Sequence, residues 1–253
     1  MKSTFLIAII LVTTCVARAD LVSTVNIEHT GYGASGKLRV WGGGLHGASV
    51  RGGVYMLDKT GDTGQGTIWP DGPLGGFCIE LSEWVPKKPK TYNVVMPKQA
   101  QNPPIFLGEP IGAEKAGYLA ELWGRFFDSN WVGSGPFTFQ QNRDAEAFAA
   151  AVWEIVYEDL PASPDGWDVT KDGTKGKGGF RCTNADTTTA NAWLHTLDGT
   201  GPKADLRALV NCKKRDYITT FHITQIPPAT PEPATIVLLG FGALSLLRRQ
   251  KNR

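Results

Sequence analysis

The sequence predicts an α+β domain in which short antiparallel strands come first, helices occupy the middle, and one strand closes the fold. Three observations predict this class. Residues 21–96 contain short runs of β-branched and aromatic residues bounded by Gly, Pro or Asp. Residues 112–198 contain segments whose apolar residues recur at spacings of three and four. Residues 216–226, DYITTFHITQI, return to a β pattern before a Pro-rich stretch.

The N-terminal part contains five predicted strands. In chain order their sequences are LVSTVNI, GKLRVWGG, SVRGGVYML, GGFCIEL and TYNVVM. The polar segment 58–73, DKTGDTGQGTIWPDGP, separates the third strand from the fourth and is predicted to be a loop. Cys78 lies in the fourth predicted strand, GGFCIEL.

Three amphipathic helices are predicted in the middle of the chain. The first covers about 112–127. The second covers about 144–159, with Asp144 as its N-cap and Pro161 just beyond its end. The third covers about 187–198 and follows Asp186, which is a suitable N-cap. The segment 203–210, KADLRALV, is predicted to be a short fourth helix.

The N-terminus has the pattern of a secretory signal peptide. Lys2 precedes the apolar run 5–12, FLIAIILV, and small residues stand at Ala17 and Ala19. The apolar run is too short to span a bilayer of about 30 Å. We therefore predict that signal peptidase removes residues 1–19, and that the exported globular domain covers 20–226.

The C-terminus carries a second targeting pattern with three parts. Pro231, Glu232 and Pro233 end a Pro-rich linker, 227–233. Fourteen uncharged residues follow at 234–247, and the chain closes with four basic residues within 248–253. Such a segment is shorter than the usual span of about 20 residues, yet it can insert where the bilayer thins. The positive cluster stays on the cytoplasmic side.

These three parts, in this order, resemble the PEP-CTERM sorting signal of exported bacterial proteins. The resemblance implies recognition by an exosortase, a membrane transpeptidase-like enzyme that cuts near Pro-Glu-Pro. Residues 234–253 then anchor the chain in the inner membrane only until processing. The mature protein is expected in the cell envelope or the extracellular matrix.

The charge balance changes once both ends are removed. The whole chain has 26 basic and 24 acidic residues, a formal net charge of +2. The signal peptide and the tail contain six of the basic residues, which leaves the mature domain at about −4. The basic excess belongs to targeting, so it gives no reason to expect nucleic-acid binding.

The exported domain retains three cysteines. We expect Cys182 and Cys212 to form a disulfide, because export permits one and both lie in the C-terminal part. Cys78 is then unpaired, although an odd number of cysteines leaves other pairings open.

The sequence contains no pattern for a catalytic set, a metal site or a cofactor site. None of the four histidines stands at metal-ligand spacing from another His or Cys. Calcium binding by Asp165, Asp168 and Asp172 stays open, although their spacing matches no complete calcium loop.

One further resemblance rests on two segments, GGFCIELSEWV at 75–85 and EAFAAAVWEIVYE at 146–158. Together they resemble the thioester domain of bacterial surface proteins, in which a strand Cys reacts with a helix Gln. The resemblance places Cys78 at the Cys position and Phe148, Ala151, Val152 and Trp153 at the helix positions. The Gln position is occupied by Ala149, which has no acyl group to donate.

We therefore expect a non-catalytic structural or adhesive protein whose partner is a surface or matrix polymer. Two alternatives stay open. The first is a covalent adhesin with a working thioester, which Ala149 disfavours. The second is a secreted hydrolase of envelope polymers, which requires two acids, or a nucleophile and a base, to meet in one cleft.

Overall fold

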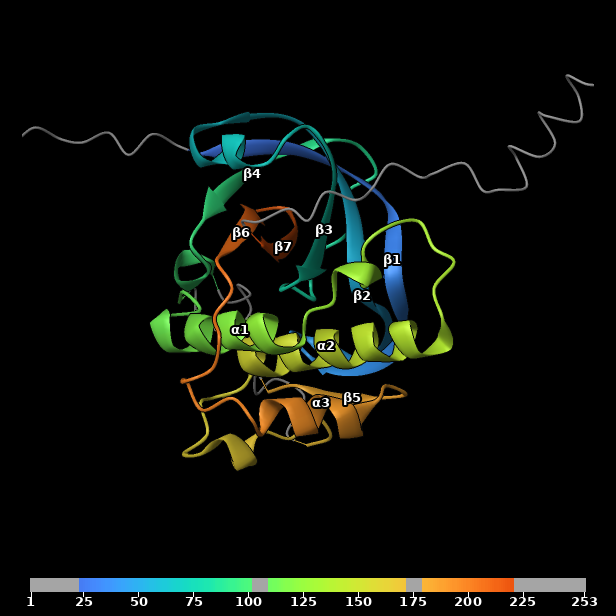
Figure 1. The fold of residues 1–253 in the computed structure, drawn as a ribbon, viewed down its shortest axis with the longest axis vertical. Coiled ribbons are helices and arrows are strands. Elements are labelled where there is room, and N and C mark those ends of the chain that lie inside the picture. Colours follow the sequence, from blue (N-terminus) through green and yellow to red (C-terminus); the bar gives the residue numbers. More distant parts are fainter. Residues whose placement is uncertain (1–22, 102–108, 172–178, 221–253) are drawn as a thin grey trace, which may run out of the picture.

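An antiparallel sheet and three α-helices make up the computed structural model, which describes residues 23–101, 109–171 and 179–220 (Figure 1). The predicted α+β class is confirmed. The strands are β1 (Thr24–Gly42), β2 (Leu45–Thr63), β3 (Gly72–Cys78), β4 (Lys90–Val95), β5 (Arg181–Thr183), β6 (Leu206–Asn211) and β7 (Lys214–Thr220). The helices are α1 (Ala113–Phe126), α2 (Phe139–Tyr157) and α3 (Thr187–Leu194).

Six of the strands form a closed ring. The order across the sheet is β2-β3-β7-β6-β4-β1-β5, and β1 also pairs with β2, which joins the two sides. β5 pairs with β1 outside the ring. Buried residues alternate with exposed ones along β4, where Tyr92 and Val94 are buried, so one face of each strand fills the interior. α1 and α2 lie across one end of the ring, with α3 and β5 beyond α2 (Figure 1).

β1 and β2 form a long, irregular hairpin. Each strand has 19 residues, and their pairing shifts register at four points. These irregularities bend the hairpin so that it packs against α2. Gly36 shows how close this packing is, because a Cβ there would lie 1.2 Å from Glu146 Oε1. The predicted strands LVSTVNI and GKLRVWGG are therefore parts of one strand, β1. Residues 58–63 of the predicted loop belong to β2.

α2 is the central helix of the fold. Every residue from 145 to 156 is buried. The helix begins five residues before the predicted start, because Thr138 and Gln141 form a capping box. The Thr138 side chain accepts from Gln141 N at 3.1 Å, and Gln141 Oε1 accepts from Thr138 N at 2.8 Å. Asp144 is therefore a residue of the helix and not its N-cap.

An aromatic cluster joins α2, α1 and β3. The ring of Phe148 lies 4.7 Å from that of Phe77 and 4.8 Å from that of Trp123. Trp131 adds a third contact at 5.5 Å. These edge-on and tilted geometries are favourable for aromatic rings, and the cluster holds the end of β3 against the helices.

Two helix predictions in the C-terminal part need correction. Residues 203–210 do not form a helix, since β6 occupies most of them and pairs with β4 and β7. The third helix, α3, ends at Leu194 and not at 198. Its predicted N-cap is confirmed, because the Asp186 side chain accepts from Thr189 N at 3.1 Å. The predicted closing strand is present as β7, and residues 221–226 lie outside the described part.

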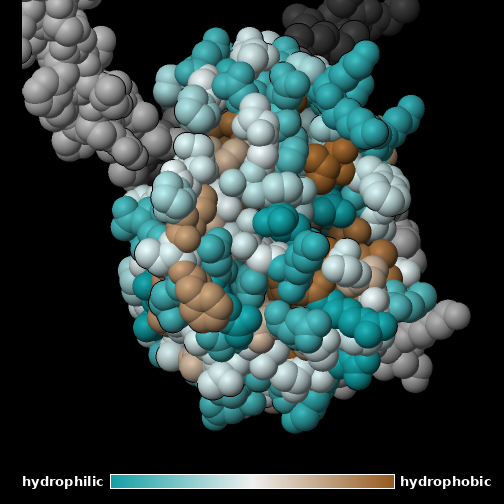
Figure 2. Space-filling view, turned by 90° about the vertical axis from the view of Figure 1, so that its right-hand side faces the viewer, coloured by the Kyte–Doolittle hydropathy of each residue, from teal (hydrophilic) through white to brown (hydrophobic). Residues whose placement is uncertain are grey.

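The surface on the side of β1 and β2 is mostly hydrophilic, with hydrophobic residues in small, separate patches (Figure 2). In the parts of the chain that the structure describes, no helix is long and apolar enough to cross a membrane. The predicted tail at 234–253 lies outside them.

Candidate functional site

The strand and helix singled out in the sequence are in contact. Trp153 Nε1 on α2 donates to the backbone oxygen of Cys78, at the end of β3, at 2.8 Å. One residue earlier, Phe77 packs on Phe148. Ala149 lies one turn before Trp153, and a Cβ at Gly52 of β2 would lie 3.3 Å from the Ala149 methyl. The expected face-to-face placement of Cys78 and Ala149 stays a prediction.

The Cys78 thiol is sealed from solvent. Its side chain is buried, and Sγ donates to the backbone oxygen of Glu80 at 2.9 Å. Burial is the largest cause that raises the pKa of Cys78, to about 11. A thiol with such a pKa is almost entirely protonated near neutral pH, so it is a poor nucleophile.

The predicted disulfide between Cys182 and Cys212 is wrong for this structure, in which both are free thiols. Cys182 is buried on β5, where it pairs with Val40 of β1. Cys212 is exposed in the turn between β6 and β7. These elements lie in different parts of the fold (Figure 1), because the chain passes through α3 and crosses to the ring between them.

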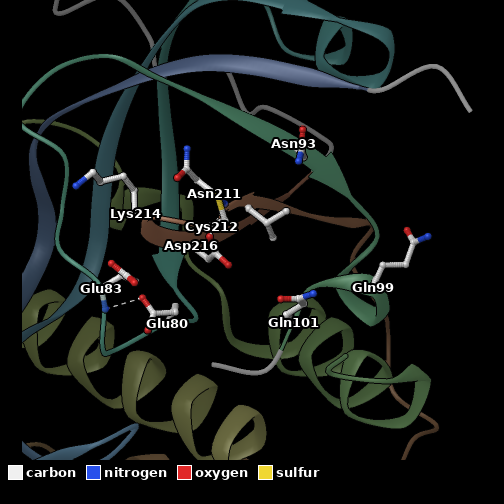
Figure 3. Close-up of a pocket in the computed structure, with 10 residues that line it drawn as sticks. Glu80, Glu83, Asn93, Gln99, Gln101, Asn211, Cys212, Lys214 and Asp216 are labelled. Carbon is white, nitrogen blue, oxygen red and sulfur yellow. Dashed lines mark hydrogen bonds between the residues drawn. The ribbon is translucent and has the colours of Figure 1, made fainter. Parts of the chain in front are cut away.

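An open, polar pocket of about 410 Å³ lies where several loops and strands meet (Figure 3). Glu80 and Glu83 come from the loop after β3 and lie on one side, whereas Gln99 and Gln101 lie on the other. Its remaining lining residues belong to β4, β6, β7 and the β6–β7 turn: Asn93, Val210, Asn211, Cys212, Lys214 and Asp216. The pocket is therefore rich in amides and carboxylates.

Two of the three carboxylates also hold backbone in place. Glu80 accepts from Ser82 N at 2.6 Å and from Glu83 N at 2.8 Å, so it shapes the loop that carries Glu83 (Figure 3). Asp216 Oδ1 accepts from Asn211 N at 2.7 Å and so fixes the β6–β7 hairpin.

The carboxyl group of Asp216 has an unusually high pKa. Burial raises the pKa of its carboxyl group to about 7, and the negative charges of Glu80 and Glu83 act in the same direction. A carboxyl group that holds a proton near neutral pH can donate a hydrogen bond or a proton.

The amide side chains give the pocket its capacity for binding. Asn93 and Gln101 are exposed, and neither makes a side-chain hydrogen bond to another described residue. Each amide offers two donor hydrogens and one acceptor oxygen. A ligand with many hydroxyl groups can use both kinds of group.

Sequence analysis missed this pocket. Its polar residues are spread over more than 130 positions of the chain, between Glu80 and Asp216, and form no local motif. The pair Glu80 and Glu83 was the nearest signal, but acidic residues in a loop are usually exposed to solvent.

Metal binding finds no support in the described residues, which contain no group of three potential ligands. Asp168, one of the three loop acids, already interacts with Lys171, Thr170 and Asn191. Asp172 lies outside the described part.

Comparison with known proteins concerns the end of the chain. Residues 229–252 match the family model described as the PEP-CTERM protein-sorting motif. The chain carries a PEP-CTERM sorting signal. The match includes Pro231, Glu232 and Pro233, which confirms the predicted motif. No curated protein matches the chain, and no solved structure does.

The PEP-CTERM signal indicates where this protein is sent in the cell. It implies an exported protein that passes through the membrane to the envelope, with exosortase as its processing partner. The matched residues cover only the tail, so the signal does not say what the globular domain does.

Proposed function

We propose that the mature domain is a non-catalytic, adhesive protein of the cell envelope or extracellular matrix, where it binds a surface polymer. The observation that carries this proposal is the polar pocket. Amide side chains line an open space of about 410 Å³, a volume within the usual range for ligand sites. Export through a PEP-CTERM signal brings that pocket to a polymer-rich compartment.

Two features argue against the covalent adhesin. Ala149 has no carboxamide from which a thioester could form, and Cys78 is a buried, protonated thiol. The purified protein should therefore have no mass deficit equal to one ammonia, and it should not react with methylamine. Ala149→Gln is the stronger test, since a methylamine-sensitive bond in that variant would show that Cys78 and position 149 face each other.

The adhesive function is tested with surface polymer isolated from the native host. The mature protein should sediment with the polymer, and Asn93→Ala/Gln101→Ala should weaken binding about tenfold through lost hydrogen bonds. Gln140→Ala, an exposed amide on α2 outside the pocket, is the matched control. A wild-type protein that does not sediment with the polymer contradicts the proposal.

A hydrolase is the second candidate, because Glu83 and Asp216 share one pocket. Asp216 with a pKa of about 7 could act as the acid and Glu83 as the base. The two functions differ in their effect on the polymer. After long incubation, adhesion leaves the length distribution of the polymer unchanged, whereas hydrolysis shortens it and is lost in Asp216→Asn.

A further inference from the structure

A second surface outside the pocket is built by strand register across β2, β1 and β5. Lys37, Arg39 and Trp41 are spaced two residues apart on β1, so they share one face of the sheet. Leu38 and Val40, which alternate with them, are buried. Lys37, Arg39 and Trp41 therefore point away from the core.

The neighbouring strands extend this face. On β2, Arg51 stands opposite Lys37, and Ser49 stands opposite Arg39. On β5, Arg181 stands opposite Trp41, and Thr183 stands opposite Arg39. We call the seven residues of this three-stranded surface the basic face: Lys37, Arg39, Trp41, Ser49, Arg51, Arg181 and Thr183.

The basic face carries four cations and no acidic residue. None of the four makes an ion pair with another described residue. Glu146 interacts electrostatically with Arg51, but it belongs to α2, on the buried side of the hairpin, and it is paired with Arg143. Like charges directly opposite each other, as at Lys37 and Arg51, destabilise a sheet. Among the described residues, the fold therefore maintains a cluster of positive charge in which no cation is held in an ion pair.

Trp41 orders two of the cations. The Arg181 guanidinium lies 4.1 Å from the centre of the Trp41 ring, and that of Arg39 lies 5.5 Å from it. Arg39 Nε also donates to Gly47 O at 3.0 Å. Gly47 allows this arrangement, because a Cβ there would lie 3.2 Å from both Arg39 Nε and the Trp41 ring. The cations are thus held in place before any ligand arrives, which lowers the entropic cost of binding.

An open cavity of about 390 Å³ adjoins the basic face at Ser49 and Arg51. Tyr32, Glu83, Trp84 and Arg215 also line it, so the cavity itself holds one acidic residue beside two arginines, and Trp84 is 81% exposed. Arg51 lies over the Tyr32 ring at 4.8 Å and donates to Ser35 Oγ at 3.0 Å. An exposed indole beside ordered guanidinium groups offers an apolar face for stacking and donors for anionic oxygens.

We propose that the basic face, together with the Trp84 cavity, binds a linear acidic polysaccharide. The inference rests on the proposed adhesive function, to which it adds a second binding surface and the chemical class of polymer that this surface takes. Cations on one strand repeat every two residues, about 6.6 Å, and neighbouring strands lie about 4.8 Å apart. A flexible chain with a carboxylate on each sugar can meet several of these cations at once, while a sugar ring stacks on Trp84.

Polygalacturonate, a linear polyuronate, is the probe for this site, and dextran is the uncharged comparison. The mature protein should bind polygalacturonate but not dextran. Raising the ionic strength from about 0.01 M to about 1 M shortens the Debye length from about 30 Å to about 3 Å and should abolish binding. Binding that persists at high salt, or equal binding of dextran, overturns the proposal.

Matched variants locate the site. Lys37→Gln/Arg39→Gln should weaken polygalacturonate binding about tenfold, because it removes two of the four cations. Lys98→Gln/Lys203→Gln makes the same change in net charge at exposed lysines outside the face and should bind like wild type. Lys37→Arg/Arg39→Lys keeps both charges and should also bind. Equal affinities for the Lys37→Gln/Arg39→Gln variant and wild type overturn the assignment.

Binding of other polyanions tests whether the basic face prefers a polysaccharide over a nucleic acid or an anionic membrane. Double-stranded DNA and phosphatidylglycerol vesicles should bind more weakly than polygalacturonate, since a DNA duplex presents phosphates and not pyranose faces, and the lipid headgroup has no sugar ring to stack on Trp84. Tighter binding of either one overturns the polysaccharide assignment. If the Lys37→Gln/Arg39→Gln variant still adheres fully to polymer from the host, this inference fails and the adhesive function stands. If wild type does not adhere to that polymer, the adhesive function itself fails.

Discussion

At the scale of single residues, burial decides which cysteine can react. Cys78 and Cys182 are buried, and burial raises their pKa values to about 11 and about 12. Cys212 is exposed at the rim of the polar pocket. The thiol suggested by the family resemblance is therefore protected, and the reactive one is Cys212, which the sequence analysis had placed in a disulfide.

Alkylation of the native mature protein tests this difference. With iodoacetamide at about pH 8, Cys212 should be modified quickly, whereas Cys78 and Cys182 should react only after denaturation. Intact mass and peptide mapping report the sites. A native protein in which Cys212 resists labelling until it is reduced contradicts the free thiol and restores the disulfide hypothesis.

Asp216 makes stability depend on pH. Its pKa is about 7 in the folded protein, against 3.8 ordinarily. Between about pH 4 and pH 7 the folded protein therefore keeps a proton that the unfolded chain has released, so stability falls as the pH rises through this window. The loss of unfolding free energy is complete above about pH 7 and is at most about 4 kcal/mol.

Asp216→Asn should remove that loss, because the amide is neutral and can still accept from Asn211 N. Relative to wild type, the variant should gain unfolding free energy as the pH rises from about 4 to about 7. Denaturant unfolding at a series of pH values measures this. Asp165→Asn, an exposed acid outside the pocket, is the control. Parallel pH profiles for wild type and Asp216→Asn would falsify the assignment.

At the scale of elements, α2 stabilises the fold through its buried face. Phe148 is fully buried in the aromatic cluster, whereas Phe139 in the first turn of the same helix is 79% exposed. Phe148→Ala should cost about 3–5 kcal/mol of unfolding free energy, and Phe139→Ala less than about 0.5 kcal/mol. Chemical denaturation of both variants tests this directly. Similar losses for the two would show that the cluster is not the core of the domain.

The three helices could be predicted because their apolar residues recur at regular spacings of three and four over many positions. Asp186 was predicted correctly as an N-cap, but the start of α2 was missed. Thr138 and Gln141 cap it from a segment with no apolar periodicity. The prediction of a helix at residues 203–210 was wrong for a different reason. Leu206, Ala208 and Val210 fit a strand period, but Leu209 also gives them a helical spacing, and only pairing with β4 and β7 decides between the two.

At the scale of the whole molecule, the pairing of distant strands and loops creates two surfaces that the sequence could not reveal. The polar pocket combines loops and strands from Glu80 to Asp216, and the basic face depends on the register of β5, a strand of only three residues. Neither surface can be predicted from a local sequence pattern, because each needs the pairing of segments far apart in the chain. The targeting tail is the opposite case. It is read as a linear segment, so its function could be predicted from sequence alone.

That linear tail leads to a prediction about the whole chain in its host. The mature protein should begin at Asp20, because signal peptidase cuts after Ala19. It should lack the residues after about Pro233, because exosortase recognises the PEP-CTERM signal. Until the cut, the four basic residues should keep the C-terminus on the cytoplasmic side. Intact mass of protein from the host measures both ends.

Alanine at Pro231, Glu232 and Pro233 should leave the tail attached and keep the protein in the membrane fraction. Pro227→Ala/Pro228→Ala changes the same linker outside the matched residues 229–252, so it should be processed like wild type. A wild-type mass that still includes LLRRQKNR contradicts processing. The tail would then act as a permanent anchor, and the polar pocket and basic face would meet their polymers only at the membrane surface.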